Sequence, residues 1–375
     1  MRPIRVLAAD DSSLVRRLLV DALRAEPLLE LVGTAATGRI ALSKLGLLAP
    51  DVVVLDIEMP ELDGLATLSE LRRTHPRLPV VMFSAFTERG AAATLDALAA
   101  GATDYVTKPH AAGGADVAIR SIRDELVPKL LVLGGDAADS AVGASFPAGV
   151  GGAAAGAAAG VVARSRTAGN GPVDAVVVGV STGGPNALAQ LVPRLPADLG
   201  VPVVVVVHMP PMFSRLLAER LDAGAQVPVA EGSAGAALAP GQVWIAPGGL
   251  HLGVRRDGAA VRLTTDDGPL VNACRPSVDV LFAAAAATWG PRVLAVVMTG
   301  MGADGLRGCE AIRDAGGQIV VQDAATSVVW GMPGAVAAAG LADRVLPLGG
   351  LADEIVRRAA VRRTRPAVLG GDRRR

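Results

Sequence analysis

The chain has 375 residues, more than one ordinary hydrophobic core holds and a length that suits two domains. Its 36 lysine and arginine residues balance its 36 aspartate and glutamate residues. This balance argues against a general nucleic-acid binder, which needs a basic excess. The most apolar run, 201–207, is too short to cross a bilayer, and the N-terminus turns acidic too early for a signal peptide. We therefore expect a cytoplasmic protein without membrane insertion.

Residues 4–124 alternate short apolar runs with amphipathic helical patterns. The predicted strands are Ile4–Ala8, Glu30–Ala35, Val52–Leu55, Val80–Phe83 and Asp104–Val106, and the clearest helices are Leu14–Ala25 and Leu65–His75. Such βα units predict a doubly wound, five-stranded parallel sheet with helices on both faces. Ligands of these sheets bind beyond the carboxyl ends of the strands.

Acidic and polar residues follow four of these strands: Asp10, Asp11, Asp56, Ser84 and Lys108. Three carboxylates at one sheet edge repel each other and need a cation, and oxygen ligands suit Mg²⁺. Asp56 can then attack a phosphoryl group, while Lys108 neutralises the phosphate and Ser84 hydrogen-bonds it. A single aspartate at a strand end is more often a cap or turn former, but the whole set favours a phosphorylation site.

The segments LAADDS, VVVLDIEMPELDGL, VVMFSAF and ATDYVTKP resemble the receiver domain of two-component response regulators, over about residues 3–124. The resemblance implies a histidine kinase as phosphodonor. It also implies that Asp56 is the phospho-acceptor, that Asp10, Asp11 and Asp56 bind Mg²⁺, and that Ser84 and Lys108 sense the phosphate. Tyr105 matches the aromatic residue that changes rotamer on activation, although an amphipathic ring at a strand edge explains it equally well.

Two segments lack the patterns of a folded domain. Residues 128–172 lose periodicity and fill with Gly, Ala and Ser, so we predict a flexible linker over 125–172. The Arg-rich segment 362–375 predicts a solvated tail, with a contact to an acidic partner as the alternative.

The region between them, 173–361, again alternates and predicts a second, mainly parallel α/β domain. An antiparallel hairpin is expected between Val243 and Thr264. The predicted strands are Ala175–Gly179, Val203–Val207, Val243–Ala246, Leu252–Arg255, Val261–Thr264, Val293–Met298 and Gln318–Gln322. The predicted helices are Asn186–Arg194, Phe213–Ala223, Ser277–Thr288, Leu306–Ala315 and Ala352–Val361.

Ser181 lies in VVVGVSTGGP, where an apolar strand, a glycine turn and a helix-opening proline lift a hydroxyl off a strand end. A serine hydrolase also needs a base and a group that orients it. His208 follows the strand 203–207, and Asp304 lies in a Gly-rich loop that offers backbone donors. A histidine or an aspartate at a strand end is often structural, but their position at the same sheet edge as Ser181 favours a catalytic role. The order Ser, His, Asp differs from that of α/β-hydrolases, chymotrypsin and subtilisin, so their triads cannot be transferred here.

Cys274 and Cys309 are too few for a disulfide framework. Their flanking residues, NACRP and RGCEAI, lack metal-ligand spacing. We expect two reduced, buried thiols.

The segments GVSTGGP, VHMPPMFS, APGGLHL, CRPSVDVLF and MTGMGADG resemble chemotaxis protein-glutamate methylesterases, and with the receiver the resemblance covers nearly the whole chain. It implies a Ser181, His208 and Asp304 triad, an oxyanion contact from the Met301 N–H, and a positioning role for Thr182. The implied reaction hydrolyses glutamate γ-methyl esters on methyl-accepting chemoreceptors, releasing methanol, and deamidates their glutamines. No metal or other cofactor is implied in this half.

Two other functions fit parts of the second domain. GVSTGG could cradle nucleotide phosphates, but the P-loop lysine and a ribose-binding acid are missing. The domain could also be a non-catalytic interaction module.

Overall fold

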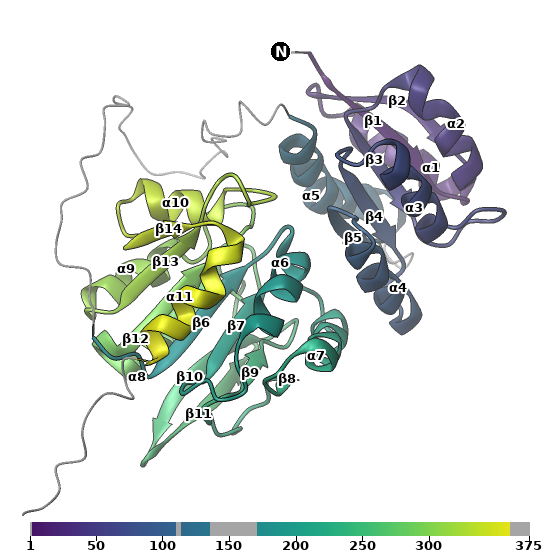
Figure 1. The fold of residues 1–375 in the computed structure, drawn as a ribbon. Helices are drawn as coiled ribbons and strands as arrows, with labels where there is room; N and C mark the ends of the chain where they lie inside the picture. Colours follow the sequence, from purple (N-terminus) through teal and green to yellow (C-terminus); the bar gives the residue numbers. More distant parts are fainter. Residues whose placement is uncertain (1, 110–113, 136–170, 361–375) are drawn as a thin grey trace, which may run out of the picture.

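The computed structural model describes residues 2–109, 114–135 and 171–360. They form two α/β domains (Figure 1). The first is built on a parallel sheet in the order β2-β1-β3-β4-β5. Its strands are β1 (Ile4–Ala9), β2 (Leu29–Ala35), β3 (Val52–Asp56), β4 (Val80–Ser84) and β5 (Asp104–Thr107). Its helices are α1 (Ser13–Arg24), α2 (Gly38–Leu48), α3 (Gly64–Thr74), α4 (Glu88–Ala99) and α5 (Gly114–Gly134).

The second domain has a seven-stranded sheet in the order β14-β13-β12-β6-β7-β9-β8 and a separate hairpin, β10-β11. The strands are β6 (Ala175–Val180), β7 (Val203–Val207), β8 (Val229–Glu231), β9 (Val243–Ile245), β10 (His251–Asp257), β11 (Ala260–Asp266), β12 (Val293–Val297), β13 (Gln318–Gln322) and β14 (Arg344–Leu346). The helices are α6 (Gly184–Leu191), α7 (Phe213–Gly224), α8 (Val278–Trp289), α9 (Leu306–Asp314), α10 (Met332–Ala338) and α11 (Leu348–Ala360), with 3₁₀ turns at Val192–Arg194 and Gly290–Arg292.

Alternation along each central strand divides the core into two layers. In β6, Val176 and Val178 join the cluster that contains α6, α7 and α11, whereas Val177 joins the cluster of α8, α9 and α10. Because both faces are covered, β6, β7 and β12 carry no polar side chain. None of the helices in the described ranges is long and apolar enough to cross a membrane.

The structure places two boundaries differently from the sequence analysis. Helix α5 continues to Gly134, past both the receiver limit at 124 and Pro128, because Leu126, Val127 and Leu130 are buried against the first domain. The predicted linker 125–172 therefore begins within a helix. Strand β9 lies in the parallel sheet beside β7, and the antiparallel hairpin comprises only β10 and β11. The remaining linker residues, 136–170, and the tail 362–375 lie outside the described ranges.

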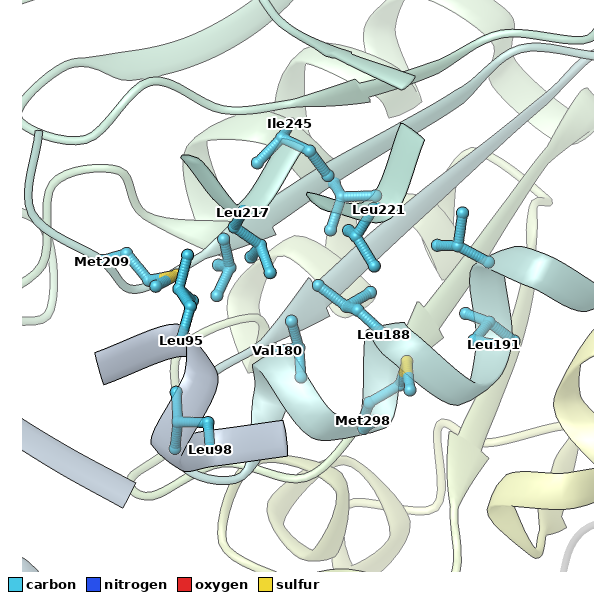
Figure 2. Packing of buried hydrophobic residues seen from close by; sticks show 14 of the residues in the cluster. Leu95, Leu98, Val180, Leu188, Leu191, Met209, Leu217, Leu221, Ile245 and Met298 are labelled. Carbon is cyan, nitrogen blue, oxygen red and sulfur yellow. The ribbon is translucent and has the colours of Figure 1, made fainter. Parts of the chain in front are cut away.

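The two domains touch through α4 of the first and α6 and α7 of the second. Leu95 and Leu98 of α4 belong to one apolar cluster with Met209, Leu188 and Leu217 of the second domain (Figure 2). Polar contacts add to it: Asn186 donates to the Ala102 carbonyl at 3.2 Å, and ion pairs join Arg215 to Glu88 and Arg220 to Asp96.

Aromatic rings extend this interface to β5. Tyr105 stacks on Phe213 with ring centroids 5.0 Å apart and planes 6° apart. Phe86 lies on Phe213 as well, at 6.3 Å. Tyr105 is buried, and burial raises the pKa of its hydroxyl well above the usual range. The residue is thus part of a domain interface, which its sequence context did not reveal.

Candidate active site and phosphorylation site

Ser181 directly follows β6 and precedes α6. Its N–H donates to the Thr299 carbonyl at 3.0 Å, which ties it to the end of the neighbouring strand β12. Gly183 then adopts a φ of 75°, which glycine allows without strain, and Pro185 occupies the first turn of α6. The strand–turn–helix geometry expected from the sequence is present, and it holds the serine at the carboxyl edge of the sheet.

His208 and Asp304 meet at the same edge. The His208 N–H bonds the carbonyl of Val180, which precedes Ser181, at 3.3 Å. Nε2 of His208 lies 2.8 Å from Oδ2 of Asp304. The described residues include no hydrogen bond between Ser181 and His208 or between the Thr182 side chain and His208. Catalytic hydrogen bonds are often long before substrate binds.

Asp304 is fixed by the N-terminus of α8. Its carboxylate accepts hydrogen bonds from the N–H groups of Val278 and Asp279, from Ser277 Oγ at 2.8 Å and from Asn272 Nδ2 at 2.7 Å. Helix N-termini favour negative charge because their N–H groups lack intrahelical partners. Burial alone would raise the pKa of Asp304, but His208 and these donors outweigh it and lower the pKa to about 2.

The second ring nitrogen of His208 faces a thiol. Nδ1 lies 3.6 Å from Cys274 Sγ. Burial would lower the pKa of His208, but the hydrogen bonds and charges of Asp304 and Cys274 raise it to about 9. The expectation of two buried thiols is therefore wrong for Cys274, which is partly exposed and beside the candidate base, and right for Cys309.

The backbone of the loop after β12 lies close to Ser181. The Thr299 N–H donates a hydrogen bond to Gln322 Oε1, and the Gly300 N–H donates one to the Val329 carbonyl. Within the described ranges the Met301 N–H has no protein acceptor, so it is free to contact an oxyanion. A side chain at Gly300 would collide with Met332 and with Ser181 Cβ, 2.9 Å from the added atom. Glycine at 300 thus lets the loop approach the serine.

The predicted residues of the first domain also converge. Lys108 Nζ lies 2.8 Å from both Asp10 Oδ2 and Asp56 Oδ2. One carboxylate oxygen from each of Asp10, Asp11 and Asp56 lies within 4.8 Å of the others, a donor set that fits Mg²⁺.

Burial shapes two further residues of this site. Burial raises the pKa of Asp56 to about 6 against the opposing effect of Lys108, with the Asp10 charge adding to the rise. Ser84 is buried at the end of β4, where its hydroxyl contacts the carbonyls of Ala85 and Gly90.

Known proteins share both domains. The family model of the CheB methylesterase matches residues 176–355, and that of the response regulator receiver domain matches residues 6–118. A relative from Trichodesmium erythraeum, named protein-glutamate methylesterase/protein-glutamine glutaminase, is 47% identical over 96% of this chain and 99% of its own length. The chain belongs to the CheB methylesterase family.

Two further similar proteins were found. A relative from Nocardioides sp. with the same name is 48% identical, covering 98% of each chain. The solved Thermotoga maritima CheB methylesterase catalytic domain is 40% identical, covers 49% of this chain and 97% of that chain, and gives a TM-score of 0.48.

In this member of the methylesterase family, sequence reasoning missed the supports of Asp304. Asn272 and Ser277 come from one segment, 272–277, that also carries Cys274. The predicted helix Ser277–Thr288 already placed a helix N-terminus here, and in the structure Ser277 is the N-cap residue of α8. No sequence signal indicated that this helix end would meet Asp304. His251, the other histidine of the domain, is buried and bonds the Pro269 carbonyl, so its role is structural.

Proposed function

We propose that this chain is a phosphorylation-controlled protein-glutamate methylesterase and protein-glutamine glutaminase, with chemoreceptors as substrates and a histidine kinase as phosphodonor. The names of relatives that match almost the full length support the activity. The observation that carries the assignment of residues is the His208–Asp304 hydrogen bond at the sheet edge that bears Ser181. A cytoplasmic location remains the expectation from the sequence.

In the proposed reaction, Ser181 Oγ attacks the carbonyl carbon of a glutamate γ-methyl ester. His208 accepts the serine proton through Nδ1, since Nε2 is bonded to Asp304, and passes it to the departing methanol. Water, activated by the same imidazole, then hydrolyses the acyl-enzyme to glutamate. A glutamine side chain would give the same acyl-enzyme with ammonia as the leaving group. The Met301 N–H stabilises the oxyanion.

In the receiver domain, Asp56 accepts the phosphoryl group. Asp10, Asp11 and Asp56 would hold Mg²⁺, which neutralises the charge that gathers at this sheet edge. Lys108, already paired with Asp10 and Asp56, is positioned to bind a phosphate on Asp56, and Ser84 to hydrogen-bond it.

Control would act through the domain interface. Phe213, which stacks on Tyr105, is the first residue of α7, and His208 lies five residues before it, directly after β7. Docking therefore engages the segment that carries the candidate base. We expect phosphorylation of Asp56 to shift the population from docked to undocked, with Tyr105 on β5 as the connecting residue.

The test is labelling and turnover by Ser181→Ala protein. A fluorophosphonate should label the wild type at Ser181, and Ser181→Ala should lose both the label and chemoreceptor demethylation. Its circular dichroism should stay unchanged, because a strand-end hydroxyl contributes little packing. Turnover near the wild-type rate in Ser181→Ala protein would refute this mechanism.

A further inference from the structure

A tight turn brings a thiol to the candidate base. Val271 and Cys274 exchange backbone hydrogen bonds, and Asn272 and Ala273 between them adopt φ values of 52° and 60°. The turn directs Asn272 to the Asp304 carboxylate and Cys274 to Nδ1 of His208. Donor atoms of Cys274, His208 and Asp304 lie within 4.8 Å of one another. Together they form a thiol–imidazole–carboxylate relay beside the serine.

This thiol has the surroundings of a reactive nucleophile, and the other cysteine does not. Cys274 is partly exposed and His208 is positioned to take its proton, the arrangement that activates a thiol. Cys309 of α9 is completely buried in an apolar cluster, and burial raises the pKa of its thiol far above the usual range. A buried thiol in apolar surroundings is inert. The chain therefore holds one reactive and one silent cysteine.

We propose that Cys274 is a modification site at which low-molecular-weight disulfides switch the esterase off. In the neutral form of the imidazole, the thiol gives its proton to His208 Nδ1, and the thiolate attacks one sulfur of the disulfide. A new S–S bond forms to Cys274, the original S–S bond breaks, and the leaving thiolate takes the proton from the imidazole. One disulfide is consumed and one free thiol is released, so atoms and electrons balance.

The modification stops hydrolysis because of where the sulfur lies. Asp304 occupies Nε2, so Nδ1 is the nitrogen through which His208 would exchange a proton with Ser181. A group attached to Cys274 Sγ would occupy the space in front of Nδ1. The loss of hydrolysis rests on the proposed function, whereas the reactivity of Cys274 towards disulfides does not.

The experiment treats the full chain with 5,5′-dithiobis(2-nitrobenzoate) and follows the released thiolate by absorbance. One thiol per chain should react, demethylation should fall in parallel, and dithiothreitol should restore it. Cys309→Ser protein should behave like the wild type. Cys274→Ser protein should release no thiolate and keep whatever activity it had before treatment. His208→Gln should slow thiolate release by about tenfold or more, a readout independent of esterase activity.

The outcomes separate the two proposals. An untreated wild type without demethylation refutes the proposed function, while thiolate release still decides the reactivity of Cys274. No reaction in the folded protein, a reaction equally fast in His208→Gln, or modified Cys274 with unchanged activity would overturn the modification site.

Discussion

Among single residues, Asp304 sets the charge of the active site. Its carboxylate is held ionised by the N-terminus of α8, and this charge in turn favours the protonated form of His208. A protonated imidazole cannot accept the proton of Ser181. On the proposed mechanism, we expect the protonated form of His208 to be favoured at neutral pH and its deprotonation to precede attack by Ser181.

We expect demethylation to increase with pH towards about 9, because the pKa of His208 is raised to about 9 from its ordinary 6.5 and only the neutral imidazole accepts the serine proton. Cys274→Ser should move the inflection to lower pH, because the hydrogen bond and charge of Cys274 contribute to the rise. The measurement is kcat/KM against pH for both proteins. A wild-type plateau reached below pH 7 would contradict the assignment of the base.

Gly300 provides a second prediction at this scale. Gly300→Ala should lower kcat by about tenfold or more, because the added methyl group would displace Ser181 and misplaced reacting groups are costly. The matched control is Gly200→Ala, where an added Cβ meets nothing within 4 Å. Steady-state kinetics on both variants compare the sites, and equal activities would show that the loop does not position the serine.

Among secondary-structure elements, the pattern of apolar residues in the sequence predicted the long, buried strands and helices. The strand 203–207 was predicted with its observed ends because five consecutive valines fit only a strand covered on both faces. Strands β8 and β14 were missed, because three residues at a sheet edge are too few to show an alternation of apolar and polar side chains. Helix α10 was missed as well: its seven residues are too few for a helical pattern to stand out.

The candidate site was predictable to a similar extent. Ser181, His208 and Asp304 each follow a buried strand, so a shared sheet edge followed from parallel topology. The contacts with Asn272 and Cys274 did not follow, because they depend on how the segment between β11 and α8 folds back. The stacking of Tyr105 on Phe213 depends on docking of one domain on another, which no local pattern encodes.

The interface of α4 with α7 is testable through its charges. Reversing Arg215 and Arg220 to glutamate places like charges opposite Glu88 and Asp96, so the domains should separate and the unphosphorylated chain should demethylate severalfold faster. Adding Glu88→Arg and Asp96→Arg restores opposite charges and should return the low rate. Unchanged demethylation after the first reversal would show that these contacts do not restrain the enzyme.

At the scale of the whole molecule, the chain joins a phosphorylation site to a hydrolytic site through one interface. Covalent connection keeps the receiver at high effective concentration near the second domain, so a modest interface suffices for docking. The contacts are apolar at Leu95 and Leu98, aromatic at Tyr105 and charged at Glu88 and Asp96. We expect a signal at Asp56 to reach the esterase by changing how often this surface is engaged.

The most direct measurement compares demethylation of one chemoreceptor by three proteins: the unphosphorylated full chain, the chain phosphorylated by acetyl phosphate with Mg²⁺, and the fragment from Val173. We predict that the fragment is faster than the unphosphorylated chain by about 5- to 150-fold, the usual range of allosteric coupling, and that phosphorylation closes most of this gap. Asp56→Asn should stay slow under the same treatment. Equal rates for the fragment and the unphosphorylated chain would contradict control by docking.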